Sequence, residues 1–262
     1  MSSPIFGAHS RLDSDTVTVS PGSATGFPPA NLGDDRLYTY WKASASGTTF
    51  VKTDTTGSAA SVSYFGMASH NLFTVGATLA FQGSPDNSTW TTIFTTTPTD
   101  NLIILRAFTA VSYRYYRAYI TGASAAVQIG ELSWGVAVDP GYGFEVGFDP
   151  NEEDLNARYS ESQTGNILGV VLTFTGRRTG VKLRLIPDSF IRDNTTGGFK
   201  DFWDNHASKF KPFFFAWNKD TAYEKDGYFA IVDTGSRIRR PLVTPLSTGY
   251  RDLEFDIIGV KE

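Results

Sequence analysis

Short runs of apolar, aromatic and threonine residues with strand character dominate the first part of the chain. In "TTFVK" (48–52) and "RYYRAYI" (114–120), every second side chain lies on the same face of a strand. Turn-forming segments such as "GSPDNS" separate the runs. Eight runs with this spacing are typical of a β-sandwich or jelly roll. They lie at 16–20, 48–52, 60–67, 75–82, 90–95, 102–108, 114–120 and 126–134.

The later part of the chain has longer apolar runs. "ILGVVLTFT" (167–175) is almost continuously apolar, which predicts a buried strand. "VKLRL" (181–185) alternates strictly, so we expect Val181, Leu183 and Leu185 on one face of a strand. Further strands are predicted at 213–217, 228–232 and 252–260.

One segment of the later part has the period of a helix. The sequence "GGFKDFWDNHASKF" predicts a single helix near 198–210, and Pro212 ends it. One helix packed on a sheet covers the apolar face of each. The predicted buried face carries Phe199, Phe202, Trp203, His206 and Phe210.

Charge and turn content place a boundary between two domains. Seven basic and eleven acidic residues precede position 151, and sixteen of each follow it. The segment from Val138 to Asp154 holds two Asp-Pro pairs and several glycines, which disfavour both helix and central strand. We therefore predict a jelly roll over 1–140, a linker over 141–154 and a second β domain over 155–262.

Composition narrows the classes of function. The net charge of −4 and the absence of a basic tract argue against sequence-specific nucleic-acid binding. Cysteine is absent, which excludes disulfides, thiolate metal sites and a cysteine nucleophile. The N-terminal residues lack a basic segment followed by an apolar core, so we expect no signal peptide. No apolar run approaches the roughly 18 residues that span a bilayer, so we expect no membrane insertion.

No constellation of residues marks an active site. His9, His70 and His206 lack the spacing of metal ligands. The acidic "DPNEED" (149–154) lacks the glycine and the distal glutamate of a calcium loop, and a solvated linker explains it better. No hydrolase, metalloprotease, phosphate-binding or dinucleotide-binding motif occurs. We therefore expect no catalytic residues, no cofactor, no metal and no enzymatic activity.

Aromatic side chains are the candidate ligand contacts. Tyr40 and Trp41 could stack on the face of a sugar ring, and Trp90 and Trp134 also carry suitable rings. Each tryptophan adjoins a predicted strand, however, so packing in the core is the favoured interpretation. In "GSPDNSTW" (83–90), we expect Asp86 and Asn87 to set a tight turn and Trp90 to pack inward.

A short basic patch is the candidate subunit contact. "GSRIRRP" (235–241) contains Arg237, Arg239 and Arg240. Arg237 and Arg239 would share one face of a strand. Two interpretations stay open, a solvated strand and a charged interface between subunits.

Five motifs follow one another in the first domain. They are "PANLGDDRLYTYWKAS" (29–44), "FGMASHNL" (65–72), "GSPDNSTWTTI" (83–93), "SYRYYRAYITG" (112–122) and "VQIGELSWG" (127–135). In this order they resemble the discoidin, or coagulation-factor type C, domains of the galactose-binding-like jelly roll, over about residues 25 to 138. The resemblance implies a β-sandwich with a loop-borne sugar or protein contact, and fold alone does not fix function.

Three segments of the second domain form a further ordered set: "FKDFWDNHASKFKPFFFAW", "GYFAIV" and the terminal "YRDLEFDIIGV". Over about residues 155 to 262, this set resembles the tube-type β domain of bacteriophage tail and baseplate proteins. It implies a non-enzymatic distal-tail subunit that forms a ring, a hexamer, at the tail tip of a virion assembled in the host cytoplasm. The implied partners are other copies, the tail tube protein, the baseplate hub and tail fibres. The alternative is a carbohydrate-binding protein that contacts host-surface glycans, and a third, weaker one is a glycan-active enzyme.

Overall fold

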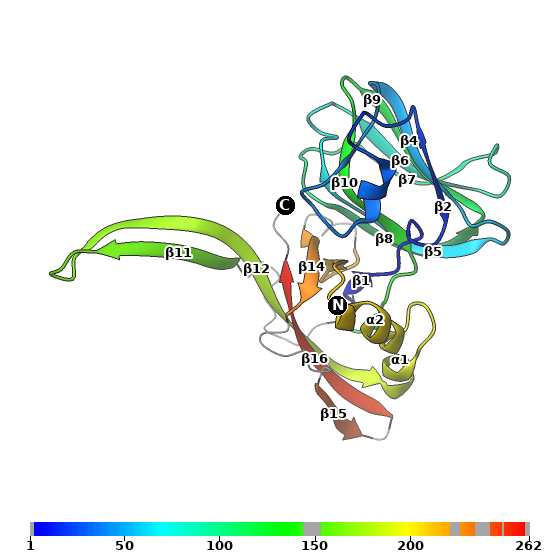
Figure 1. Ribbon diagram of the computed structural model, residues 1–262. Coiled ribbons are helices and arrows are strands. Elements are labelled where there is room, and N and C mark those ends of the chain that lie inside the picture. The colour runs from blue at the N-terminus through cyan, green and yellow to red at the C-terminus, as the bar shows by residue number, and fades with distance from the viewer. Residues whose placement is uncertain (1–2, 144–152, 221–225, 234–241, 248, 260–262) are drawn as a thin grey trace.

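The structure is a computed structural model that describes residues 3–143, 153–220, 226–233, 242–247 and 249–259. Within these residues the protein is mainly β, with antiparallel strands in three sheets. Two sheets face each other in a sandwich, and the third lies beside it and extends into a long hairpin (Figure 1). The predicted combination of a β-sandwich and a second β region is confirmed.

One sheet of the sandwich has 5 strands in the order β2-β4-β9-β6-β7. Side chains of β4 alternate between the two faces of this sheet. In β4, Thr49 and Val51 are buried, whereas Phe50 and Lys52 lie on the outer face of the sheet. The strands are β2 (Thr16–Ser20), β4 (Gly47–Asp54), β6 (Thr78–Ser84), β7 (Thr91–Thr96) and β9 (Tyr115–Ala123).

The facing sheet has 4 strands in the order β3-β10-β5-β8. All eight runs predicted in the first part of the chain are therefore strands of the sandwich, and β3 is an addition. A 3-10 helix, η1 (Pro29–Gly33), precedes β3. The strands are β3 (Trp41–Lys42), β5 (Ala60–His70), β8 (Ile104–Tyr113) and β10 (Gln128–Gly135).

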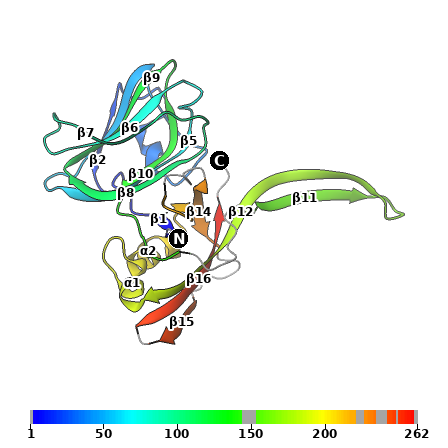
Figure 2. The same cartoon turned by 180° about the vertical axis from the view of Figure 1, so that it is seen from behind.

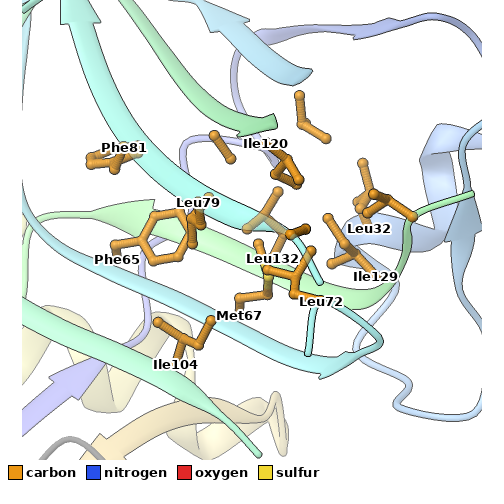
Figure 3. Packing of buried hydrophobic residues seen from close by; sticks show 14 of the residues in the cluster. Leu32, Phe65, Met67, Leu72, Leu79, Phe81, Ile104, Ile120, Ile129 and Leu132 are labelled. Carbon is orange, nitrogen blue, oxygen red and sulfur yellow. The ribbon is translucent and has the colours of Figure 1, made fainter. Parts of the chain in front are cut away.

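Aromatic rings fill the middle of the sandwich. Trp134 lies almost parallel to Phe65, with ring centroids 6.1 Å apart, and Phe81 packs against both rings. The Trp134 indole N–H donates to Thr53 Oγ1 over 3.2 Å, so the one polar group of this ring is satisfied in the core. Figure 3 shows Phe65 and Phe81 among the aliphatic side chains of the same cluster.

The third sheet has 7 strands, with the path β1-β13-β14-β16-β12-β11 and β15 paired to β16. Its buried face packs on the helical segment. The strands are β1 (Ile5–Gly7), β11 (Glu153–Glu161), β12 (Ile167–Pro187), β13 (Phe213–Ala216), β14 (Tyr228–Val232), β15 (Leu242–Ser247) and β16 (Tyr250–Gly259).

The N-terminal strand crosses the predicted boundary between the domains. In β1, Ile5 and Phe6 pair with β13 of the third sheet, although the sequence pattern assigned them to the jelly roll. Phe6 is buried against Phe202 and Phe215, and this long-range apolar contact decides its place. The expected linker 141–154 lies mostly outside the described residues, and β11 already begins at its end.

The predicted helix is present but shorter than expected. It comprises α2 (Phe199–Asn205) and a 3-10 turn, η2 (Ala207–Lys209), and another short helix, α1 (Asp188–Arg192), precedes it. Phe199, Phe202 and Trp203 are buried as predicted. Phe210 is not, because the chain leaves the helix after Asn205 and Phe210 takes a left-handed conformation with φ 57°.

The sandwich and the third sheet share a tight interface. Phe214 of β13 is buried, and its ring covers the backbone of Gly66 in β5. A Cβ atom added at Gly66 would lie only 2.6 Å from the Phe214 ring, so glycine is what permits this approach. Phe229 packs beside Phe214 with 5.0 Å between ring centroids. These contacts join the two regions through apolar packing.

The strand β12 is much longer than either run that predicted it. It comprises 21 residues, which corresponds to about 70 Å of extended chain. Its second half pairs with β16, where Val181 and Leu183 are buried as predicted. The register shifts between Leu183 and Ile186, so Ile186 is buried and Leu185 is exposed, contrary to the strict alternation expected.

Candidate functional site

The first half of β12 forms a hairpin with β11 that projects away from the rest of the protein (Figures 1 and 2). The turn "SQTGN" closes it. Ser162 N–H donates to the Asn166 carbonyl, and Gly165 N–H donates to the Ser162 carbonyl, over 2.8 and 2.9 Å. Gly165 has φ +81°, a conformation that glycine adopts without strain. The tip of the hairpin is thus well defined by the sequence.

One face of this hairpin is apolar and exposed to solvent. Cross-strand pairing sets Tyr159 opposite Val170 and Ala157 opposite Leu172, and paired residues of an antiparallel ladder share a face. Tyr159 and Val170 are each 64% exposed and Leu172 is 55% exposed. We call Ala157, Tyr159, Val170 and Leu172 the hairpin apolar face. The predicted buried strand at 167–175 is therefore wrong about burial, since Val170 and Leu172 lie in solvent.

The opposite face of the hairpin is more polar. Arg158 stands opposite Val171, and Ser160 stands opposite Gly169. The opposite face therefore mixes polar Arg158 and Ser160 with the exposed Val171, whereas the hairpin apolar face carries no polar side chain other than the Tyr159 hydroxyl. Among the strands that the structure describes, β11 ends the sheet and pairs only with β12. The hairpin therefore offers both an apolar face and a free strand edge.

The two predicted sugar contacts, Tyr40 and Trp41, differ in their exposure to solvent. Trp41 is fully buried, and its indole N–H donates to Ser23 Oγ over 2.8 Å, so no face of the ring is free for a sugar. Core packing, the favoured interpretation, is correct for Trp41 and Trp134. Tyr40 is half-buried and stacks on Phe27 with ring centroids 4.7 Å apart, so Phe27 covers one of its faces.

The turn "GSPDNSTW" is formed as expected, but its tryptophan is not inside. The Asp86 carboxylate accepts N–H groups of Ser88 and Thr89 over 2.9 and 2.8 Å, and these bonds hold the pKa of Asp86 well below its usual range. Asn87 takes the left-handed conformation with φ 61°. Trp90 is half-buried on the outer face of the 5-stranded sheet, where the Arg117 guanidinium covers its ring.

Backbone contacts hold the rings of His70 and His206 in place. His70 Nε2 lies 2.8 Å from the Leu102 carbonyl, and His70 Nδ1 accepts the Leu72 N–H, so both ring nitrogens are engaged. His206 Nε2 lies 2.6 Å from the Pro212 carbonyl. Burial lowers the pKa of each of these two histidines to about 4, which keeps both neutral at physiological pH.

A buried carboxyl lies where η1 meets β10. Glu131 is 4% exposed, and its Oε2 has no hydrogen-bond partner. Burial, with the nearby Asp35, Asp34 and Asp13 carboxylates, raises the pKa of Glu131 to about 9. Glu131 and Asp34 carry oxygens of the kind that hard cations bind. Within the described ranges, however, no three His, Cys, Asp or Glu side chains are placed to hold a metal ion.

The basic patch cannot be placed. Arg237, Arg239 and Arg240 lie outside the described residues, so the predicted charged interface stays a prediction. No helix in the described ranges is long and apolar enough to cross a membrane.

Comparison with known proteins gives similarity to carbohydrate-binding modules. No family model and no curated protein sequence matches the chain. A valine-to-methionine mutant of chitosan-binding module 1 of a chitosanase/glucanase from Paenibacillus sp. IK-5 is 26% identical over 46% of this chain and 92% of its own, with a TM-score of 0.39. The CBM32 of AlyQ, in complex with 4,5-unsaturated mannuronic acid, is 28% identical over 45% of this chain and 92% of its own, with a TM-score of 0.36. A GH29 fucosidase from Ruminococcus gnavus is 18% identical over 48% of this chain and 26% of its own, with a TM-score of 0.41. None of these three is a tail or baseplate protein.

Proposed function

We propose that this protein is a non-enzymatic structural subunit that joins a multi-copy assembly through the β11–β12 hairpin. The hairpin apolar face carries this proposal. A two-stranded hairpin is marginally stable by itself in water, and an exposed apolar edge promotes association. Covering Tyr159, Val170 and Leu172 would contribute roughly 3–5 kcal/mol of hydrophobic free energy in each subunit. A partner that covers this face therefore stabilises the hairpin as well.

The occupant of the hairpin apolar face in this proposal is a second copy of the chain. Every copy exposes one hairpin apolar face and therefore needs one surface that covers it. A second copy of the chain supplies one such surface for each face. A head-to-tail contact of this kind closes into a ring when its rotation divides a full turn. The balanced charge of the second half, with sixteen acidic and sixteen basic residues after position 150, suits contacts between like chains.

More specifically, the assembly in this proposal is a hexameric ring at the tip of a bacteriophage tail. The resemblance of residues 155–262 to tube-type tail domains supports it. In that setting the tail tube protein, the baseplate hub and tail fibres would be the further partners, and the virion would be the location. Glycan binding at the host surface is the alternative, and the similarity to carbohydrate-binding modules supports it. This alternative does not require the hairpin.

Light scattering coupled to size-exclusion chromatography tests the assembly. We expect the wild type to elute as an oligomer at micromolar concentration. Tyr159→Thr with Leu172→Thr should shift it to the mass of one chain, because threonine keeps strand propensity and removes apolar surface. Val171→Thr is the matched control on the opposite face and should leave the oligomer intact. A wild type that stays a single chain at every concentration, and in the presence of tail proteins, would refute the proposal.

A further inference from the structure

A second surface stands apart from the hairpin, on the outer face of the 5-stranded sheet. The central strand β9 buries Tyr116 and Ala118 and turns Tyr115, Arg117 and Tyr119 outward. Successive outward residues are about 7 Å apart along the strand. The strand therefore presents two aromatic rings with a guanidinium between them.

The neighbouring strands widen this surface. Register places Lys52 of β4 and Gln82 of β6 on either side of Arg117. The Arg117 guanidinium lies 3.9 Å from the centroid of the Trp90 ring and 4.4 Å from that of Tyr119. Gln82 Oε1 accepts the Arg117 Nε–H over 2.8 Å, which fixes the arginine in this position. We call Lys52, Gln82, Trp90, Tyr115, Arg117 and Tyr119 the outer aromatic surface.

The turn of residues 83–90 bounds this surface at one end. Lys52 Nζ donates to Asn87 Oδ1 over 3.0 Å and lies 5.9 Å from the centroid of the Tyr115 ring. The same turn places Trp90 at the start of β7. The Asp86 carboxylate fixes the turn through backbone hydrogen bonds, and the turn fixes the positions of Asn87 and Trp90.

Lys52 and Arg117 form no ion pair with a described carboxylate, although Arg114 and, more weakly, Lys52 lower the pKa of Asp54. Asp54 lies on the same face but forms an ion pair with Arg114, whose Nε is 3.0 Å from Asp54 Oδ1. Among the described residues, no carboxylate lies within ion-pair distance of Lys52 or Arg117; their side-chain partners are Asn87 and Gln82. Two cations without carboxylate partners thus lie among half-buried rings and an amide.

We propose that the outer aromatic surface binds an acidic glycan, a polysaccharide segment that bears uronate or similar acid groups. Arg117 lies over one face of Trp90 and of Tyr119, and Arg114 lies over one face of Tyr115. The other face of each ring suits the apolar C–H face of a sugar ring. Gln82 and the backbone-anchored turn supply hydrogen-bonding groups, and Lys52 and Arg117 suit a carboxylate. Here each ring is flanked by polar groups, which fits a polyhydroxylated ligand better than the apolar core of a protein interface. The inference gives the alternative function, glycan binding, a site and a substrate class, and it does not depend on assembly.

Isothermal titration calorimetry with soluble oligogalacturonate tests the proposal, with the methyl-esterified oligomer as the neutral probe. We expect the acidic probe to bind and the ester to bind at least tenfold more weakly. Trp90→Ala and Lys52→Glu should each weaken binding of the acidic probe at least tenfold. Phe73→Ala, which removes an exposed ring elsewhere on the sandwich, and Lys42→Glu are the matched controls and should leave binding unchanged.

Further arms separate the alternatives. Far-ultraviolet circular dichroism checks that each variant is folded, and Lys52→Glu, on the surface, tests the site if Trp90→Ala unfolds. If poly-glutamate competes as well as the oligosaccharide, the surface recognises negative charge alone, and the proposal is overturned. Absence of binding by the wild type would overturn it too, as would binding lost only in Tyr40→Ala. Light scattering on the same samples reports the oligomer separately, so failure of assembly and failure of glycan binding are distinguishable.

Discussion

Gly66 is the position where the contact between the sandwich and the third sheet can be tested with one methyl group. In Gly66→Ala the new Cβ would lie 2.6 Å from Cγ of Phe214, whereas ordinary contacts are 3.4–4 Å. The Phe214 ring would have to move by about 1 Å to restore an ordinary contact. Phe214 is 1% exposed and packs against Phe229, so there is little space into which it can move.

The expected cost follows from this lack of space. Overpacking a close-packed core by one methyl group typically costs about 1–3 kcal/mol. For a protein of this size, such a loss lowers the melting temperature by about 2–4 °C for each kcal/mol. Gly66→Ala should therefore lower it by about 2–12 °C.

Urea unfolding followed by tryptophan fluorescence and by calorimetry measures this change. Gly57→Ala is the matched control, because a Cβ at that glycine has no atom within 4 Å. Combining Gly66→Ala with Phe214→Leu should recover part of the loss, since the smaller side chain relieves the collision. If Gly66→Ala unfolds within about 0.5 kcal/mol of the wild type, the size of an ordinary surface substitution, the tight interface does not exist.

Three further predictions concern titration and the tryptophans. The pKa of Glu131 is raised to about 9 in the folded protein. The contribution of Glu131 to the free energy of unfolding is therefore fully present below about pH 4.5 and is lost as pH rises toward 9. Glu131→Gln should flatten this decline in urea titrations at each pH. A rise in melting temperature on adding calcium would instead indicate that a cation neutralises the cluster. His70 and His206, with pKa values of about 4, act in the opposite sense, so stability should fall as pH drops from 6.5 to about 4, as chemical unfolding at each pH would show. Trp41→Ala should cost about 3–5 kcal/mol and Trp90→Ala about 1 kcal/mol, because only Trp41 is fully buried; equal losses would contradict their placement.

Local periodicity was sufficient to predict most of the sandwich. The runs at 48–52 and 114–120 were predicted as strands and are strands, and every second side chain in each is buried. The helix face of Phe199 and Phe202 was predictable for the same reason. Where a side chain is buried by its own domain, the pattern of the sequence and the structure agree.

The candidate functional surfaces were less predictable because other partners decide them. Val170 and Leu172 lie in an apolar run that is indistinguishable from a core strand, yet the described chain leaves them exposed. Trp90 follows a turn, and only the pairing of β7 with β6 shows that its ring meets Arg117 outside the sandwich. The joining of Ile5 to the third sheet depends on a contact more than two hundred residues away in sequence.

The central claim is that a second copy covers the hairpin apolar face. Because the chain has no cysteine, Val170→Cys creates a single attachment point for a thiol-reactive photo-crosslinker. Illumination should give a ladder of covalent oligomers whose last band reports the number of copies in a ring. The same label at Val171, on the opposite face, should give a much weaker ladder. A single-chain band from the Val170 label at concentrations where the protein is abundant would contradict the account.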